Sequence, residues 1–401
     1  MKIALPDFCL VLLLGSSPSA TADFAAQHFA PGEIMPSGLP PNALEAAVTD
    51  RLRQRALTAV DISGMTSDDR STLLRIAKAT YTQPVAIAVL ADVEDAATRN
   101  RAMQQVILRL QQRDGVRASH AVRAHQAVTI TRERLDTDLR HLTGPFDIIG
   151  DVHGCADELE VLLGQLGYRM AWTETAGERQ VSVMAPPGRR LIFVGDLVDR
   201  GPRAPDTLRI VMSAAANGVG FCVPGNHDAK FLRWLAGRNV TLTHGLDRTV
   251  AQMNGEPHSL HQAAKAFLDD LPSHMWCDGG RLVVAHAGLT EAMIGRSTGQ
   301  VREFCLYGDT DGDTDANGLA LRYHWAANYR GTTAIVYGHT PLADAAWFNN
   351  TLCLDTGCCF GNKLTALRWP EGDIVSVPAL KEYARPHRGF GHPPPRPTAL
   401  G

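Results

Sequence analysis

Five short blocks of polar residues follow one another along the chain, and each combines metal ligands or phosphate-binding groups with glycine. They are Gly150–Gly154 (GDVHG), Gly195–Gly201 (GDLVDRG), Gly225–Asp228 (GNHD), His286 within VVAHAG, and Gly338–Thr340 (GHT). Aspartate, asparagine and histidine supply the oxygen and nitrogen ligands of divalent metal ions, and glycine permits the tight turns that bring such residues together. Any one of these blocks is common, but all five in this order predict a two-metal phosphoesterase.

Phosphate-ester hydrolysis needs a strong nucleophile and positive charge beside the phosphoryl oxygens, and two divalent ions about 3.5–4 Å apart supply both. The predicted metal ligands are Asp151, His153, Asp196, Asn226, His286 and His339. Asp151 and His153 can reach one ion, the Asp196 carboxylate can bridge both ions, and the other three fit the second ion. Imidazole nitrogens with amide and carboxylate oxygens suit manganese, iron and zinc alike.

The remaining charged residues of the blocks predict the other parts of the mechanism. His227 is adjacent to Asn226, so we expect it beside the leaving oxygen, with Asp199 holding it protonated as a general acid. Arg200 can bind two phosphate oxygens through its planar guanidinium group. A hydroxide shared by the two ions is then expected to attack phosphorus in line while His227 protonates the leaving alkoxide.

A short apolar segment directly precedes each of these blocks, and we expect these segments to be strands that position the blocks. They are Phe146–Ile149, Leu191–Val194, Phe221–Val223, Leu282–Ala285 and Ala334–Val336. An amphipathic helix is predicted at Cys155–Leu166, directly after the first block. Because α/β proteins build their sites in the loops after the carboxyl ends of strands, this order favours an α/β fold with one shared site.

The preceding residues alternate apolar runs with helical stretches, which is typical of a parallel βα sheet. Strands are expected at Phe8–Leu14, Leu57–Ile62 and Val85–Leu90, and helices at Asn42–Leu57, Ser71–Ala79 and Ala96–Arg113. The first twenty residues also resemble a secretory signal, but a buried strand is the interpretation that we favour. We predict a domain at 1–145, a second at 146–385 and a disordered Pro-rich tail at 386–401.

Composition sets limits on the kind of protein. A chain of 401 residues is longer than one hydrophobic core usually accommodates, so two domains are expected. A content of 20% charged residues is typical of a globular protein, and a net charge of −3 provides no overall positive field that would attract nucleic acid. No apolar run is long enough to span a membrane. Eight cysteines without zinc-type CxxC pairs favour a cytoplasmic location.

An alternating run of aspartates resembles a calcium-binding loop. The aspartates are Asp309, Asp311, Asp313 and Asp315, but Ala316 and Arg322 stand where a calcium loop needs glycine and glutamate, so a solvated acidic loop is expected.

The blocks resemble the serine/threonine-phosphatase-like branch of the calcineurin-type metallophosphoesterases. The resemblance implies two packed β-sheets flanked by helices and a dinuclear manganese, iron or zinc centre. It places the family's ligands on the six residues named above and its acid pair on His227 and Asp199. Through the segment WAANYRG it also implies a second phosphate-binding arginine, Arg330, beside Arg200.

A closer resemblance covers residues 146–385. The segments GDVHGCADELEVLLGQLGY, FVGDLVDRGP, VPGNHDAKFLRWL and DTGCCFGNKLTALRWPE are similar to the phosphatase module of bacterial polynucleotide kinase-phosphatases. That module removes terminal phosphates from RNA or DNA ends, including 2′,3′-cyclic phosphates. Residues 1–145 resemble the kinase domain of that family, yet Ala20, Thr21 and Ala22 stand where a phosphate-binding loop requires Gly, Lys and Ser/Thr. A degenerate kinase-like domain that binds no ATP is therefore expected.

We therefore predict a cytoplasmic phosphoesterase that uses two divalent ions, manganese before iron or zinc, and acts on phosphate monoesters or cyclic phosphates of nucleic-acid ends or nucleotides. Three alternatives stay open. The blocks fit a protein serine/threonine phosphatase equally well, and a dinucleoside-polyphosphate hydrolase shares the same branch. A non-catalytic scaffold is the third alternative, against which the complete ligand set argues. The sequence identifies no protein partner.

Overall fold

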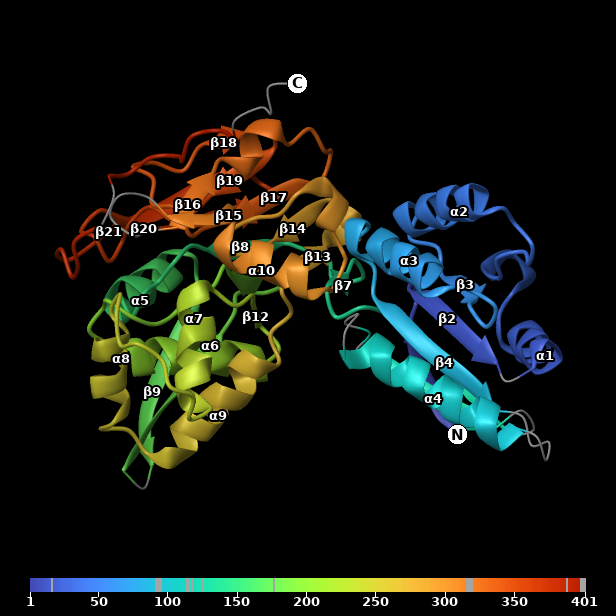
Figure 1. The fold of residues 1–401 in the computed structure, drawn as a ribbon. Helices are drawn as coiled ribbons and strands as arrows, with labels where there is room; N and C mark the ends of the chain where they lie inside the picture. The colour runs from blue at the N-terminus through green and yellow to red at the C-terminus, as the bar shows by residue number, and fades with distance from the viewer. Residues whose placement is uncertain are drawn as a thin grey trace. The chain divides into compact units, whose positions relative to one another are not determined.

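The computed structural model describes residues 1–15, 17–90, 96–112, 116, 118–123, 126–175, 177–314, 320–386 and 389–396. The chain forms two compact units (Figure 1). Unit 1 comprises Met1–Asp136 and Arg296–Thr298, and unit 2 comprises Thr137–Gly295 and Gly299–Gly401. Unit 2 begins earlier than the predicted limit at 146, because strand β7 (Asp138–Leu139) already pairs with a strand of that unit.

Unit 1 contains a parallel sheet of four strands in the order β3-β2-β4-β5. The strands are β2 (Leu10–Gly15), β3 (Thr58–Asp61), β4 (Pro84–Leu90) and β5 (Ala118–Arg123). Because the apolar run in β2 is continuous, both faces of this central strand are buried. Leu10 and Leu12 pack against helices α2 (Pro41–Arg53), α3 (Ser67–Ala79) and α4 (Ala96–Gln112), whereas Val11 and Leu13 pack against α1 (Pro18–His28).

The segment expected to resemble a phosphate-binding loop joins β2 to α1. Ser17 caps the helix by accepting a hydrogen bond from the Ala20 amide at 3.2 Å, and the Thr21 hydroxyl donates to the Ser17 carbonyl at 3.1 Å. Ser16 lies outside the described residues. Two further strands, β1 (Lys2–Pro6) and β6 (Thr129–Glu133), form a separate parallel pair in this unit.

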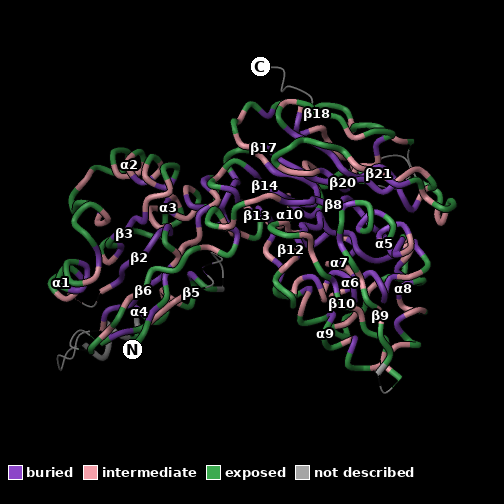
Figure 2. Tube along the Cα trace, turned by 180° about the vertical axis from the view of Figure 1, so that it is seen from behind, coloured by how far each residue is buried: buried purple, intermediate pink, exposed green. Residues whose placement is uncertain are grey.

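Unit 2 contains two larger sheets. The first has the order β12-β11-β8-β20-β21 and the second the order β18-β19-β17-β14-β13-β7. The first sheet consists of β8 (Phe146–Ile149), β11 (Arg190–Phe193), β12 (Gly220–Cys222), β20 (Lys363–Trp369) and β21 (Asp373–Pro378). Besides β7, the second consists of β13 (Met275–Cys277), β14 (Leu282–Val284), β17 (Ala334–Tyr337), β18 (Trp347–Phe348) and β19 (Thr351–Cys353). Strands of both sheets appear as buried segments in Figure 2.

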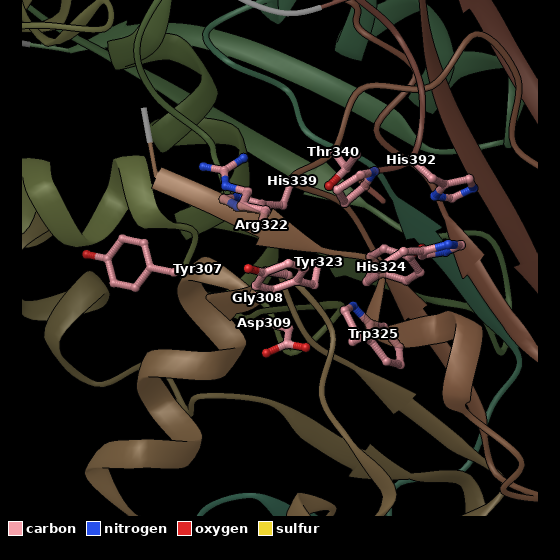
Figure 3. A pocket seen from close by; sticks show the side chains of 13 residues that line it. Tyr307, Gly308, Asp309, Arg322, Tyr323, His324, Trp325, His339, Thr340 and His392 are labelled. Atoms are coloured by element: carbon pink, nitrogen blue, oxygen red, sulfur yellow. The ribbon is translucent and has the colours of Figure 1, made fainter. Parts of the chain in front are cut away.

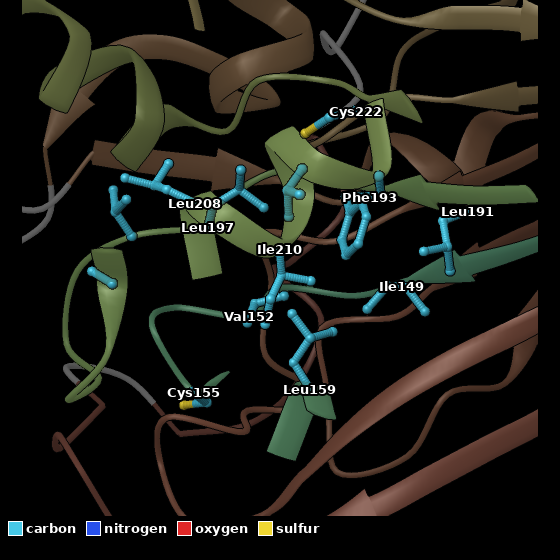
Figure 4. Packing of buried hydrophobic residues seen from close by; sticks show 14 of the residues in the cluster. Ile149, Val152, Cys155, Leu159, Leu191, Phe193, Leu197, Leu208, Ile210 and Cys222 are labelled. Carbon is cyan, nitrogen blue, oxygen red and sulfur yellow. The ribbon is translucent and has the colours of Figure 1, made fainter. Parts of the chain in front are cut away.

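One core joins the two sheets and another joins the first sheet to its helices. Ile148 and Ile192 of the first sheet share a buried cluster with Val284 and Val336 of the second. On the other side the first sheet packs on α5 (Ala156–Gln165) and α6 (Ala204–Ala216), as Figure 4 shows. The remaining helices are α7 (Asn226–Leu235), α8 (Leu246–Met253), α9 (His258–Asp269) and α10 (Gly299–Tyr307). Unit 2 is therefore built from two packed sheets with helices outside.

Two segments differ from the expectations drawn from their composition. Of the acidic stretch expected to be a loop, Asp309–Thr314 forms strand β15, which pairs with β16 (Ala320–Tyr323), whereas Asp315 and Ala316 lie outside the described residues. The Pro-rich tail, expected to be disordered, makes defined contacts over residues 389–396. The Gly391 amide donates to the Pro341 carbonyl at 3.0 Å, and the Arg396 guanidinium pairs with Asp309. The hairpin thus offers the charge, and the loop after β17 offers a backbone carbonyl, that hold the tail.

None of the helices in the described part of the chain combines the length and the apolar character that a membrane-spanning helix requires.

Candidate metal centre

The predicted metal ligands lie in the loops that follow strands of both sheets of unit 2. Asp151 and His153 follow β8, Asp196 follows β11, and Asn226 begins α7 after β12. His286 follows β14 and His339 follows β17. Strands β8, β11 and β12 are mutually parallel, as are β14 and β17, so the carboxyl ends in each sheet lie at the same edge.

Asp196 lies between two groups of ligands. Its Oδ2 atom is 3.4 Å from His153 Nε2, and its Oδ1 atom is 3.4 Å from His286 Nε2. Two clusters of potential metal-binding atoms share this residue: His153–Asp196–His227 and Asp196–His286–His339. The two oxygens of one carboxylate thus face different histidine groups, which is the arrangement that a bridging ligand requires.

The hydrogen bonds of the histidines fix which nitrogens can bind a cation. His153 Nδ1 donates to the Val198 carbonyl at 2.9 Å, and His286 Nδ1 donates to the Val194 carbonyl at 3.0 Å. A carbonyl can only accept, so the proton of each neutral ring is on Nδ1 and the Nε2 lone pair faces the cluster. His286 Nε2 then lies 3.1 Å from Asn226 Oδ1 and 3.0 Å from His339 Nδ1.

Two buried atoms of the cluster that could accept a hydrogen bond receive none from the described residues. Asp151 Oδ1 and His339 Nε2 are buried without a hydrogen-bond partner among the described residues. Buried polar atoms are normally paired, and each of these can bind a cation instead. Carboxylate oxygens, an amide oxygen and neutral imidazole nitrogens together fit divalent ions of the manganese, iron or zinc kind.

The electrostatics of the cluster also favour bound cations. Burial, together with the neighbouring Asp355 and Asp196, raises the pKa of Asp151 well above its usual range. Burial opposes the charge of Asp196 as well, but the surrounding histidines outweigh it and hold the pKa of Asp196 below its usual range. Burial and the nearby Arg200 lower the pKa of His153, so the ring is neutral, as metal binding requires.

The backbone at the centre adopts conformations that side chains rarely take. The φ angles are 47° at His153, 50° at Asp196 and 69° at His339, and those of Asp199 and Arg200 are 74° and 68°. Left-handed backbone is strained for residues other than glycine and concentrates at functional sites. The tight turns after β8, β11 and β17 are therefore maintained by the surrounding fold although they cost stability locally.

Gly338 provides a test of how closely the ligands are packed. A Cβ atom added there would lie 1.9 Å from Asp151 Oδ1, so Gly338→Ala must displace this carboxylate. A displacement near 1 Å costs about a hundredfold in rate. We expect a loss of that size in initial rates measured over a Mn²⁺ titration.

Gly164→Ala is the matched control for this substitution. Gly164 lies in α5 with nothing within 4 Å of its added Cβ, so alanine should leave the rate unchanged and stabilise the helix by about 0.5–1 kcal/mol. Full activity of Gly338→Ala would show that Asp151 is not held in the position described.

The predicted acid pair is brought together by α7, α8 and the loop after β11. His227 Nδ1 is 2.6 Å from Asp199 Oδ2, and Asp199 Oδ1 accepts a hydrogen bond from the Thr249 hydroxyl at 2.7 Å. Arg200 donates to His227 Nε2 at 2.9 Å and also contacts His153 Nε2. The guanidinium group of Arg200 therefore lies beside the first ligand group, where it can reach a bound phosphate.

The second predicted phosphate-binding arginine makes its hydrogen bonds to backbone carbonyls of its own segment. Arg330 is exposed, and its guanidinium donates to the carbonyls of Ala327 at 2.8 Å and Tyr329 at 2.6 Å. Its role in phosphate binding therefore stays a prediction. Another arginine, Arg322 on β16, lines a pocket together with His339 (Figure 3), and its charge contributes to a lowered pKa of His339, after burial as the largest cause.

Two buried carboxylates near the centre were missed by the sequence analysis. Asp355 follows β19 and accepts a hydrogen bond from the Gly357 amide at 3.0 Å, and burial raises its pKa to about 6. Asp228 accepts from the amides of Leu197 and Gly225, both at 2.9 Å, and so ties two of the blocks together. In the sequence, the feature that could have identified Asp355 is its position directly after a buried strand. The feature that could have identified Asp228 is its proximity to Asn226.

Residues 144–375 match the family model described as calcineurin-like phosphoesterase. The chain belongs to the calcineurin-like phosphoesterase family. Members of this family use a dinuclear centre of divalent metal ions, and the two His/Asp groups that share Asp196 are the candidate for it here. The chain is therefore a metallophosphoesterase, a hydrolase, as the sequence predicted.

Three proteins that share one name are similar to more than half of the chain. A protein of Anoxybacillus flavithermus named bis(5'-nucleosyl)-tetraphosphatase PrpE [asymmetrical] is 43% identical over 59% of this chain and 96% of its own length. Proteins with the same name from a Geobacillus species and Bacillus cereus are each 42% identical, covering 59% and 58% of this chain and 95% and 94% of their own lengths. None of these three carries the name polynucleotide kinase-phosphatase, so the comparisons support the family and not that closer resemblance.

Proposed function

We propose that unit 2 hydrolyses a nucleotide substrate, and specifically a dinucleoside polyphosphate, into two mononucleotides. The observation that carries this proposal is the 43% identity to a relative named as an asymmetrical bis(5'-nucleosyl)-tetraphosphatase, over nearly the whole of that relative. The substrate that the sequence analysis put first, a phosphorylated end of RNA or DNA, becomes the alternative. Asymmetrical cleavage of a dinucleoside tetraphosphate by water yields a nucleoside triphosphate and a nucleoside monophosphate.

In this proposal the six predicted ligands hold two divalent ions. Asp151, His153 and Asp196 would hold the first ion. Asp196 would also hold the second, together with Asn226, His286 and His339. Bound ions supply a nucleophile made from water at neutral pH and neutralise the charge of the phosphate oxygens.

The other residues of the centre orient and balance the reacting groups. Arg200 binds the phosphate under attack through its planar guanidinium, because this group already lies between His153 and His227. Asp199 accepts from His227 Nδ1 and fixes the ring. Arg200 donates to His227 Nε2 in the structure, so His227 can give a proton from Nε2 only after Arg200 has turned to the phosphate and Nε2 has taken up a proton. This proton matters for substrates whose leaving oxygen is strongly basic. Arg330 remains a candidate for a second contact to phosphate.

Unit 1 is proposed to take no part in phosphoryl transfer. The place of the phosphate-binding lysine is held by Thr21, and Ser17 uses its hydroxyl to cap α1. A loop without this lysine lacks the group that holds the β- and γ-phosphates of ATP. The resemblance of unit 1 to a kinase domain is a proposal that rests on the sequence alone.

A substrate panel tests the proposal. The full chain with Mn²⁺ would be given a dinucleoside tetraphosphate, an RNA with a 3′-phosphate, an RNA with a 2′,3′-cyclic phosphate and a phosphopeptide at equal concentration. We expect the dinucleoside tetraphosphate to be cleaved fastest, with triphosphate and monophosphate as products separated by ion-exchange chromatography. Faster turnover of an RNA end would favour the alternative, and faster turnover of the phosphopeptide would favour a protein phosphatase.

A further inference from the structure

Two cysteines and a glutamate form a further cluster of potential metal-binding atoms in unit 2. The sulfurs of Cys155 and Cys358 and a carboxylate oxygen of Glu158 all lie within 4.8 Å of one another. Cys155 caps the start of α5, Glu158 lies in the first turn of this helix, and Cys358 lies between β19 and β20. The fold therefore brings ligand-type atoms together from two segments that are far apart in the sequence.

The three side chains are buried, and neither the metal chemistry nor the acid pair described above uses them. Cys155 is fully buried, and Cys358 and Glu158 are each 2% exposed. Both cysteines are free thiols, and the Cys155 thiol is within hydrogen-bonding distance of Cys358. Two sulfurs in contact, beside a carboxylate and shielded from water, are an arrangement that a thiophilic cation can occupy.

The carboxylate of Glu158 has one oxygen that is hydrogen-bonded and one that is not. Oε1 accepts hydrogen bonds from the Leu380 amide at 2.9 Å and from the Tyr383 hydroxyl at 2.8 Å. Oε2 is buried and receives no hydrogen bond from the described residues. Taking a carboxylate oxygen out of water is costly unless a donor or a cation compensates it, so such oxygens are rare. A cation held between this carboxylate and the two sulfurs would supply that compensation.

The ligand types and their spacing suit zinc. Thiolates are soft ligands that select zinc over manganese or magnesium. Zn–S distances of about 2.3 Å and Zn–O distances of about 2.0–2.2 Å place the ligand atoms of a tetrahedral ion about 3.6–3.8 Å apart. Side-chain shifts of about 1 Å would bring a group within 4.8 Å to this spacing. Zinc would replace the two thiol protons, so the charge of the buried site would not change.

We propose that Cys155, Glu158 and Cys358 bind a structural zinc ion. A water molecule would complete its tetrahedral shell. The ion would fasten the start of α5 to the segment between β19 and β20, and Glu158 extends this connection to the C-terminal segment through its hydrogen bonds. His153 and Asp355 shortly precede the two cysteines in the sequence, so the ion would also steady the loops that carry them. The site contains none of the six proposed catalytic ligands, so this inference does not depend on the proposed function.

The zinc content of the full chain tests the site. The chain would be produced in zinc-supplemented medium, treated with a chelator to remove weakly bound metal, and measured by inductively coupled plasma mass spectrometry. We expect the wild-type chain to hold one zinc ion more than Cys358→Ser. Asp196→Asn, which lacks the proposed bridge of the catalytic centre, should retain this ion. Cys277→Ser is the matched control at another buried free cysteine and should also retain it.

Cobalt gives a spectroscopic signal that the catalytic ligands cannot produce. Co²⁺ bound to thiolate sulfur absorbs strongly in the near ultraviolet through charge transfer from sulfur to metal, and the six proposed catalytic ligands contain no sulfur. The cobalt-loaded wild-type chain should show this band, Asp196→Asn should keep it and Cys358→Ser should lose it. Zinc-loaded wild-type chain should also unfold at a higher temperature than Cys358→Ser, because binding of a structural zinc contributes to folding stability.

A cobalt-loaded wild-type chain without the charge-transfer band would overturn the proposal, and this result does not require any variant to fold. A disulfide between Cys155 and Cys358, detected as thiols missing from a titration under denaturing conditions, would also overturn it, because oxidised sulfurs cannot hold zinc. Failure of the proposed function gives a different result. In that case the zinc ion and the cobalt band remain, although the chain does not cleave a dinucleoside tetraphosphate in the substrate panel.

Discussion

Asp196→Asn is expected to abolish the phosphohydrolase activity of the chain, with a loss on the order of a thousandfold or more in kcat/KM. The reason is that one residue serves both ligand groups: Oδ2 lies 3.4 Å from His153 Nε2 and Oδ1 lies 3.4 Å from His286 Nε2. A neutral amide removes the charge and replaces one of the two oxygens. Loss of the charge stabilisation supplied by bound metal ions costs several kcal/mol, and each 1.4 kcal/mol is a factor of ten.

The measurement is kcat/KM for p-nitrophenyl phosphate with saturating Mn²⁺, together with the thermal unfolding curve. Asp269→Asn is the matched control, because it makes the same change on the exposed end of α9 and should retain wild-type rates. If Asp196→Asn kept more than a tenth of the activity while remaining folded, Asp196 would not be the bridge between two ions.

His227→Ala is expected to give a loss that depends on the leaving group. A general acid contributes about 10²–10⁴ in rate when the leaving oxygen needs a proton. Alkyl phosphates release a strongly basic alkoxide and should show this loss. p-Nitrophenyl phosphate and phosphoanhydrides release anions that are stable without a proton, so their kcat should fall by about tenfold or less.

Comparison of kcat for an alkyl phosphate, p-nitrophenyl phosphate and a dinucleoside tetraphosphate measures this difference. Asp199→Asn should give the same pattern, because Asp199 accepts the hydrogen bond that holds the His227 ring at 2.6 Å. An equal loss on all three substrates would assign His227 a different role. It would then be a metal ligand, since it also lies in the cluster with His153 and Asp196.

The six predicted ligands could be placed from the sequence because each lies next to a recognisable strand end. The runs Phe146–Ile149 and Leu191–Val194 predicted β8 and β11 within one residue. Parallel strands in one sheet bring their carboxyl ends to one edge, so the ligands after β8, β11 and β12 converge, as do those after β14 and β17. The packing of the two sheets then brings the two groups together. The chemistry of the residue types then indicated the roles that are proposed for them.

The parts that could not be predicted depend on contacts distant in the sequence. Asp355 follows β19, but no other ligand-type residue lies beside it to distinguish it from other strand ends, and its proximity to Arg200 depends on the packing of the sheets. Arg322 lies on a strand in a stretch whose acidic residues indicated a loop. The tail is poor in apolar residues, but its contacts are a backbone hydrogen bond to His324 and an ion pair to Asp309, which composition does not reveal.

The metal content of the purified chain tests the central claim most directly. The wild-type chain would be loaded with Mn²⁺, freed of unbound metal by gel filtration and measured by inductively coupled plasma mass spectrometry. Two manganese ions per chain are expected, falling below one in Asp196→Asn and staying at two in Asp269→Asn. A wild-type chain that retains no transition metal, or one whose content is unchanged by Asp196→Asn, would contradict a dinuclear centre built on Asp196.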